Sequence, residues 1–271
     1  MSVDSVKMCT PGRIPGLQEK PGGISGSTLK WIAIVSMLID HLGLALVARL
    51  YITNYFSLDS QGLVTLYKVY YLMRKIGRLA FPIYCFLLVE GFLKTRCRWK
   101  YALRLGIFAL CSEIPFDLAF SSKWLDFGYQ NVFFTLFLGM LSMMGAEWLF
   151  EKIQDRVTPQ YRFFINAVTA IVFALPAALV AHLMRSDYSY AGIFCIMGLY
   201  LFRHRKWEQS AVGAVSFLWE IPASLAFLPI IFYNGKRGMK MKYFFYLFYP
   251  LHLLGIYLIC RWLGIAATAV I

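Results

Sequence analysis

Seven apolar runs, each about as long as a membrane-spanning helix, account for most of this chain. The hydrocarbon core of a bilayer is about 30 Å thick and takes about 20 apolar residues per helix. The chain is 59% hydrophobic and 15% charged, whereas globular domains are about 45–50% apolar and about 25% charged. The sequence therefore predicts an all-α, polytopic integral membrane bundle with about eight membrane-embedded helices. The runs are 29–51, 79–95, 102–121, 131–150, 163–184, 211–232 and 243–263, with a shorter one at 190–202.

The domain organisation that follows is simple. Residues 1–28, rich in Gly, Pro and Ser, are expected to form a flexible cytoplasmic tail, since they lack the apolar core and cleavage site of a signal peptide. Residues 29–263 form a single transmembrane domain and 264–271 a short C-terminal tail. The tyrosine-rich segment 52–78 is expected to be a loop plus an interfacial helix, because Tyr favours the headgroup region.

The basic residues indicate topology. The net charge is +13, but Lys and Arg lie in short clusters between apolar runs, so a nucleic-acid partner is not expected. Clusters at 94–104 and 203–206 face the cytoplasm by the positive-inside rule, which also places the N-terminus inside. The six cysteines form no CxxC pair, so neither a disulfide nor a metal site is expected.

One segment conflicts with this topology. A complete crossing by 211–232 would put the following loop outside despite its four cations. A break near Pro222, with two half-helices returning to one side, removes the conflict and requires that the exposed backbone be buried in protein or line a water-filled cavity. The re-entrant and the complete crossing both remain open at this point.

Ionisable residues inside the apolar runs are the functional candidates, since a charge at a helix centre costs about 2.5–3.5 kcal/mol. Asp40 and His41 follow Lys30 on the first helix and lie about 16 Å deeper at a rise of about 1.5 Å per residue. His41 is a candidate general base, because imidazole titrates near neutral pH. The alternative is that Asp40 and His41 only fix helix packing.

Further candidates lie in the later helices. Glu113 and Asp117 share one helix face, which suits proton handling or a cationic acceptor; a structural network is the alternative. Arg78 begins the second helix and serves either the site or the helix end. Tyr249 and His252 lie three apart on the last helix.

The loop Tyr233-Asn-Gly-Lys-Arg-Gly238 has the composition of an anion-binding loop. Its two cations, Lys236 and Arg237, lie between glycines, but this signal has weak specificity and also fits a positive-inside turn. Asn131 opens the fourth helix and is expected to be its N-cap.

Together these residues resemble the TraX family of conjugative pilin acetylases, in order from about residue 27 to 262. The resemblance implies an inner-membrane acetyltransferase that moves acetyl from acetyl-CoA to the N-terminal amine of processed pilin. The matching segments are Lys30 to Asp40-His41, Gly77 to Gly91, Ser112-Glu-Ile-Pro-Phe-Asp117, Asn131-Val-Phe-Phe-Thr135, Tyr233 to Gly238 and Phe248-Tyr-Pro-Leu-His252.

The first helix also resembles the wider transmembrane acyltransferase group, in which an Arg is followed after ten residues by a catalytic His. Lys30 replaces that Arg here, keeping the charge but losing bidentate geometry. The resemblance implies that His41 acts as general base, while Asp40, Glu113, Asp117 or His252 tune its protonation or hold an ammonium group. The residues expected to bind acetyl-CoA are Lys236, Arg237, Lys30, Arg78 and Tyr249.

Two non-enzymatic hypotheses remain beside the acetyltransferase. Intramembrane Asp, Glu and His residues and a broken helix also fit a proton-coupled transporter, although the sequence has no detectable repeat. The second non-enzymatic hypothesis is a non-catalytic subunit of a conjugation apparatus. The expected partners are membrane lipid, acetyl-CoA and an acceptor, either pilin or another amine or hydroxyl.

Overall fold

The computed structural model describes residues 22–239 and 242–270, so most of the predicted N-terminal tail lies outside the described residues. Within those ranges the chain is helical, with two isolated β-bridges and no named strand. The prediction of an all-α fold is therefore confirmed. The α-helices are α2 (Gly26–Leu42), α3 (Ala48–Thr53), α4 (Ser60–Gly77), α5 (Ala80–Lys94), α6 (Arg98–Phe120), α7 (Val132–Ile153), α8 (Arg162–Leu183), α9 (Ser189–Leu201), α10 (Lys206–Ser216), α11 (Ile221–Ser224), α12 (Phe227–Ile231) and α13 (Lys242–Trp262).

Five helical stretches among the described residues are long and apolar enough to cross a membrane, which indicates a membrane protein. The predicted number of about eight is not confirmed. The 23-residue helix α6 carries charged residues in both halves, and α9 is only 13 residues long. The five stretches are Gly26–Thr53, Ser60–Lys94, Val132–Arg156, Pro159–Leu183 and Phe244–Trp262.

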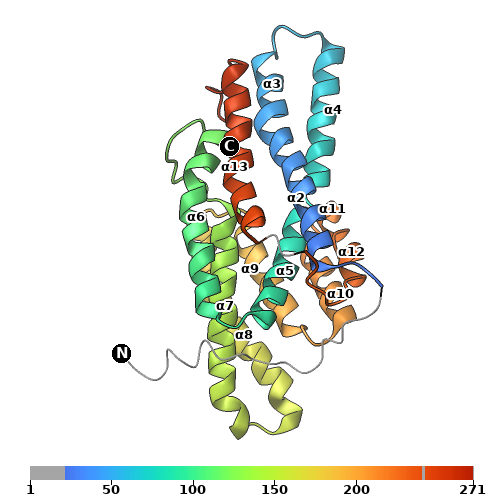
Figure 1. Ribbon diagram of the computed structural model, residues 1–271, viewed down its shortest axis with the longest axis vertical. Coiled ribbons are helices and arrows are strands. Elements are labelled where there is room, and N and C mark those ends of the chain that lie inside the picture. The colour runs from blue at the N-terminus through green and yellow to red at the C-terminus, as the bar shows by residue number, and fades with distance from the viewer. Residues whose placement is uncertain (1–21, 240–241, 271) are drawn as a thin grey trace.

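The helices overlap along the long axis of the molecule (Figure 1). Helices α3, α4 and α13 reach one end of the elongated molecule, and the α7–α8 hairpin reaches the other. Between α2 and α3 lies a π-helical turn, Gly43–Val47. Such turns are frequent at functional sites, and this one follows His41 after a single residue. The region around this turn and His41 is therefore of interest for function.

The loop and helix expected at 52–78 are both present: residues 54–59 connect α3 to α4, an 18-residue helix that packs against α2. The expected interfacial position of this helix is not confirmed, because α4 is part of a stretch that is long and apolar enough to cross a membrane. The N-cap Asp59 accepts a hydrogen bond from Gly62 N (3.0 Å) and begins the helix. Its tyrosines lie largely on the exposed face. With α5 it forms an almost continuous helix, Ser60–Lys94.

The predicted break near Pro222 is confirmed. Helix α10 ends at Ser216, and the chain turns before α11 begins at Ile221. Lys206 Nζ, at the start of α10, donates to the carbonyl oxygen of Tyr233 at 2.8 Å. The segment thus leaves and returns at the same end of the molecule, as the re-entrant hypothesis required, and Glu220 lies at its tip.

Both ends of the predicted single domain extend further than expected. Ser25 Oγ accepts from Thr28 N at 3.2 Å and caps α2, so the helix begins at Gly26. Just before it, Ile24 N donates to the carbonyl of Phe232 at 2.8 Å. Residues 22–28 are therefore part of the packed structure and not of a flexible tail.

The C-terminal segment is held by a buried arginine that the sequence analysis missed. Arg49 is 0% exposed and donates to the carbonyl oxygens of Ala119 (2.6 Å), Thr268 (2.7 Å) and Ala45 (2.9 Å). In addition, Val270 N donates to the carbonyl of Phe120 at 2.8 Å. The predicted short tail at 264–271 is thus packed across α3 and α6 over its described part, 264–270.

Candidate functional site

A cavity of about 310 Å³ is lined by residues of α2, α4, α5, α6, α7 and α13 and of the loop between α8 and α9. Four of the predicted site residues line it: Asp40, His41, Arg78 and Tyr249. They come from α2, the α4–α5 junction and α13, which are far apart in the sequence. The rest of the lining is Met37, Leu44, Tyr70, Arg74, Gly77, Ala80, Phe81, Tyr84, Phe116, Phe120, Tyr129, Val132, Asp187, Tyr188 and Val270.

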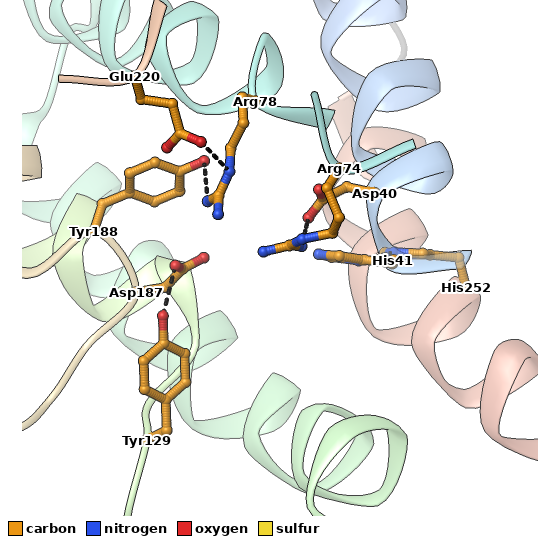
Figure 2. A network of polar contacts seen from close by, with 9 residues as sticks. All are labelled: Asp40, His41, Arg74, Arg78, Tyr129, Asp187, Tyr188, Glu220 and His252. Atoms are coloured by element: carbon orange, nitrogen blue, oxygen red, sulfur yellow. Dashed lines mark hydrogen bonds and ion pairs between the residues drawn. The ribbon is translucent and has the colours of Figure 1, made fainter. Parts of the chain in front are cut away.

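A pair of histidines defines the chemistry at one wall of the cavity. His41 Nδ1 and His252 Nε2 are 2.7 Å apart, and His252 Nδ1 lies 2.7 Å from the carbonyl oxygen of Phe248. Because a carbonyl oxygen only accepts, His252 Nδ1 carries the hydrogen, and Nε2 of the neutral ring is an acceptor. His41 therefore donates from Nδ1, which leaves its Nε2 unprotonated. Figure 2 shows this free edge of His41 pointing away from His252, toward Arg74.

Asp40 does not bond to its neighbour His41 but forms an ion pair with Arg74, with 2.6 Å between Arg74 Nη1 and Asp40 Oδ2. Both side chains are less than a fifth exposed. Successive helical positions point about 100° apart, so Asp40 faces α4 while His41 faces α13. The sequence-based expectation was that Asp40 tunes the protonation of His41, holds an ammonium group or fixes helix packing; its pairing with Arg74 was not predicted.

The re-entrant segment contributes to the same site. Glu220, at its tip, pairs with Arg78, with 2.9 Å between Glu220 Oε1 and Arg78 Nε. Arg78 Nη1 also donates to Tyr188 Oη at 3.3 Å. Arg78 thus lies in the cavity wall and does not act as a snorkelling end residue. The pair joins α4–α5 to the α10–α12 segment, which gives the break near Pro222 a structural role.

The loop between α8 and α9 supplies a further carboxylate, Asp187. Tyr129 Oη donates to its Oδ1 at 2.8 Å (Figure 2). Burial raises the pKa of the Asp187 carboxyl above its ordinary value. The flanking residues Arg185 and Tyr188 have φ of 51° and 59°, a left-handed conformation that is uncommon for non-glycine residues and clusters at functional sites.

Glu113 and Asp117, predicted as catalytic, do not line the cavity. Asn131 donates from its side-chain amide to Glu113, and its Oδ1 accepts from Phe133 N, which confirms it as the N-cap of α7. Asp117 Oδ2 accepts from Asp126 N at 2.7 Å. The two carboxylates share a face of α6, as predicted, but that face meets the α6–α7 connection and the start of α7.

Three of the residues predicted to bind acetyl-CoA, Lys30, Lys236 and Arg237, lie at the other end of α2. The carbonyl of Lys236 accepts from Gly26 N at 2.8 Å, which holds the loop 233–238 against the start of the helix. Lys30 Nζ lies 5.0 Å from the ring centroid of Phe245. The side chains of Lys236 and Arg237 are exposed. None of these three cations lines the cavity.

The sequence analysis missed Arg74, Tyr129, Asp187 and Tyr188 as site residues. For Arg74 a signal existed, because it lies four residues before Arg78 and so shares its helix face. No local pattern marks Asp187 and Tyr129, which belong to two different loops and meet only through the packing of α7 against α8.

The close approach of α4 to α2 gives a stability prediction. A Cβ built on Gly77 would lie 2.2 Å from Asp40 Cβ, so Gly77→Ala is expected to lower the unfolding midpoint in detergent. In the matched variant Gly255→Ala, inside α13, a Cβ meets nothing within 4 Å. There the higher helix propensity of Ala, about 1 kcal/mol, is expected to leave stability equal or higher. Equal effects of the two variants on the thermal midpoint would contradict this packing.

Comparisons with known proteins identify the family of this chain. A protein family described as TraX protein matches residues 25–260. A curated relative, "Probable fimbrial assembly protein FimC, serogroup H1" from Dichelobacter nodosus, is 32% identical over 250 aligned residues, covering 84% of this chain and 93% of the relative. No solved structure matches the chain significantly. The matched range includes every residue discussed in the cavity except Val270.

Proposed function

We propose that this chain, which belongs to the TraX family, is a membrane acetyltransferase that moves acetyl from acetyl-CoA to an acceptor amine. The family match and the fimbrial assembly relative support a role in pilus assembly. The proposed acceptor is the N-terminal amine of pilin, as the resemblance in the sequence implies. The observation that carries the enzymatic part of the proposal is the histidine pair, since it leaves His41 Nε2 as a free base facing a cavity.

In the proposed reaction the acceptor nitrogen attacks the thioester carbonyl carbon while His41 Nε2 takes its proton. The hydrogen bond from His41 Nδ1 to His252 holds the ring in this tautomer and stabilises the imidazolium that forms. The C–S bond then breaks, and the leaving CoA thiolate takes the proton back from His41. His41 is thus restored within one turnover.

Arg74 and Arg78 are the proposed electrostatic stabilisers. Both line the cavity, and each guanidinium has five N–H donors, of which the ion pairs with Asp40 and Glu220 use only some. Donors aimed at the oxygen of a tetrahedral intermediate are typically worth about 10²–10³-fold in rate. Asp40 and Glu220 hold the two guanidinium groups in position.

The cations at the start of α2 are the proposed site for the CoA phosphates. Lys236 and Arg237 lie beside the start of the helix that carries Lys30, since Gly26 N donates to the carbonyl oxygen of Lys236 at 2.8 Å, one helical turn before Lys30. From Lys30 the helix descends about 16 Å to the level of His41, so a donor bound along α2 would extend from these cations to the cavity. Lys236→Ala and Arg237→Ala should raise the KM for acetyl-CoA without changing kcat.

We infer that the protein lies in the bacterial cytoplasmic membrane with its N-terminus and the loop 233–238 inside, because acetyl-CoA is cytoplasmic and this loop is cationic. A single cysteine replacing the exposed Lys236, in a variant lacking the native cysteines, should react with a membrane-impermeant maleimide only after the cells are opened. Labelling in intact cells would contradict this orientation.

Transfer of radiolabelled acetyl tests the proposed activity. Purified protein in detergent is incubated with acetyl-CoA and a panel of acceptors: mature pilin, a peptide with a free N-terminus, the same peptide with a blocked N-terminus, and a sugar. Label is expected on the amine acceptors and not on the blocked peptide. Absence of both transfer and acetyl-CoA binding in folded protein would refute the proposal and favour a proton-coupled transporter.

A further inference from the structure

Arg49 is a buried arginine that follows His41 closely along the chain. It is 0% exposed, and burying a charge is costly unless hydrogen bonds hold it. Its guanidinium donates to the carbonyl oxygens of Ala45 (2.9 Å), Ala119 (2.6 Å) and Thr268 (2.7 Å). These acceptors lie in the π-helical turn after His41, in α6 and in the C-terminal segment. The guanidinium thus joins three separate parts of the chain at one point.

The π-helical turn Gly43–Val47 brings Arg49 to the helix face that carries His41. Residues eight positions apart in an uninterrupted α-helix point about 80° away from each other. The extra residue of a π turn removes about 100° of rotation, which leaves the two side chains within about 20° of one face. The contacts agree: the rings of His41 and Phe120 have centroids 5.3 Å apart, and Arg49 binds the neighbouring carbonyl of Ala119. Both side chains therefore face the end of α6.

Both side chains also contact α13, which lies against α2 and the π-helical turn (Figure 1). His41 Nδ1 is 2.7 Å from His252 Nε2, and Arg49 Nη1 donates to Cys260 Sγ at 3.8 Å. The two pairs have the same offset of 211 positions, as expected of parallel helices in a fixed register. A slip of α13 by one residue, about 1.5 Å, would break the histidine hydrogen bond, since such bonds weaken beyond about 3.2 Å. The register at Arg49 is thus the register that the histidine pair requires.

A second contact ties the far end of α13 in place. Beyond the helix, the carbonyl oxygen of Thr268 accepts from Arg49 Nε and also from Ser122 Oγ at 3.1 Å. Two residues later, Val270 lines the cavity. Arg49 therefore holds α13 through Cys260 within the helix and through Thr268 beyond its end.

We propose that Arg49 is a positioning residue: it fixes the register of α13 against α2 and α3 and so keeps His252 within hydrogen-bonding distance of His41. Arg49 does not line the cavity and is not a catalytic residue. Its effect on the histidine pair is independent of the reaction, whereas its effect on the rate rests on the proposed acetyl transfer. An arginine with a purely structural role would lower stability when replaced but leave the histidine pair of the folded protein unchanged.

Histidine labelled with ¹⁵N reports on the pair by NMR in protein purified in detergent, because the chain has only four histidines and the spectrum is simple. The Nδ1–H of His41 lies inside the 2.7 Å hydrogen bond, so its exchange with water is expected to be slow. Its signal is the one that is absent in His41→Gln. Arg49→Lys keeps the charge but loses the planar fork of donors, and we expect it to raise this exchange rate at least tenfold.

Arg203→Lys is the matched control. Arg203 Nη1 also donates to a backbone carbonyl, that of Tyr200 at 2.8 Å, but Arg203 follows α9 and does not line the cavity. This variant should keep the wild-type exchange rate. Arg49→Met, which removes the charge as well, should raise the rate at least as much as Arg49→Lys, and either variant decides the question if the other fails to fold. A folded Arg49 variant in which the His41 proton exchanges at the wild-type rate would overturn the inference, even if its unfolding midpoint were lower.

Kinetics separate this inference from the proposed function. In Arg49→Lys, kcat for acetyl transfer should fall at least tenfold while the KM for acetyl-CoA stays the same, because the cationic loop 233–238 lies at the other end of α2. Faster exchange of the His41 proton in a protein that transfers no acetyl would refute the proposed function and keep the assignment of Arg49. Wild-type kcat in a variant with fast exchange would overturn the effect of Arg49 on the rate.

Discussion

Replacing His41 with Gln is expected to lower kcat for acetyl transfer by about 10²–10⁴-fold, the range typical of a lost general base. Gln keeps a similar size and can still hydrogen-bond to His252, but it cannot take a proton. The KM for acetyl-CoA should stay the same, because the proposed phosphate site lies at the other end of α2. Initial rates with labelled acetyl-CoA and a saturating peptide acceptor measure this effect.

The matched control is His204→Gln, which makes the same change in the loop between α9 and α10, outside the cavity. It is expected to keep wild-type kcat. Both variants should elute as wild type does in size-exclusion chromatography and keep its helical circular dichroism. A folded His41→Gln variant with wild-type kcat would rule out His41 as the base.

Replacing Arg74 with Met is expected to destabilise the protein by about 3 kcal/mol, at the lower end of the range for breaking a buried ion pair. The change leaves the Asp40 carboxylate, less than a fifth exposed, without its 2.6 Å partner. Asp40→Leu should destabilise for the converse reason. The double variant, in which neither charge remains, should be more stable than Arg74→Met.

Urea unfolding in detergent, followed by tryptophan fluorescence, measures these free energies. The comparison between the single and double variants matters most, because residues in contact are not additive. If the loss of unfolding free energy in the double variant equalled the sum of the losses in the two single variants, Asp40 and Arg74 would act independently. The ion pair would then not hold Arg74 in the cavity wall.

The helical fold and the place of His41 among the polar residues of the helix interior could be predicted from local patterns. Apolar runs identify membrane helices because lipid imposes their length, and a histidine within such a run is costly unless it has a partner. The conflict between charge and hydropathy at 211–232 likewise located the break near Pro222. In each case the residues on which the prediction rests lie in one contiguous segment of the sequence.

The partners of these residues could not be predicted, because they depend on packing between distant segments. His41 and His252 are 211 positions apart, and their hydrogen bond requires α13 to lie against α2. Arg78 was identified, but its pairing with Glu220 depends on where the re-entrant tip meets α5. Spacing along one helix gives the face of a residue and not the neighbour which that face meets.

The carboxylates show the same limit of prediction from local sequence patterns. Glu113 and Asp117 carried the stronger sequence signal, two acids one helical turn apart, yet they hold the α6–α7 connection together outside the cavity. Asp187, a single acid in a loop, lines the cavity. Clustering of acids in sequence therefore predicted a polar contact correctly but not its position relative to the cavity.

The most direct test of the proposed activity is the stoichiometry of CoA release. Wild-type protein in detergent is mixed with acetyl-CoA and an amine acceptor, and the free CoA thiol and the acetylated amine are measured in the same samples over time. If the protein transfers acetyl as proposed, both appear together in equal amounts, and thiol release falls to background without the acceptor. Folded protein that releases no thiol with any amine, or releases it without acetylating the acceptor, would contradict the proposed acetyl transfer.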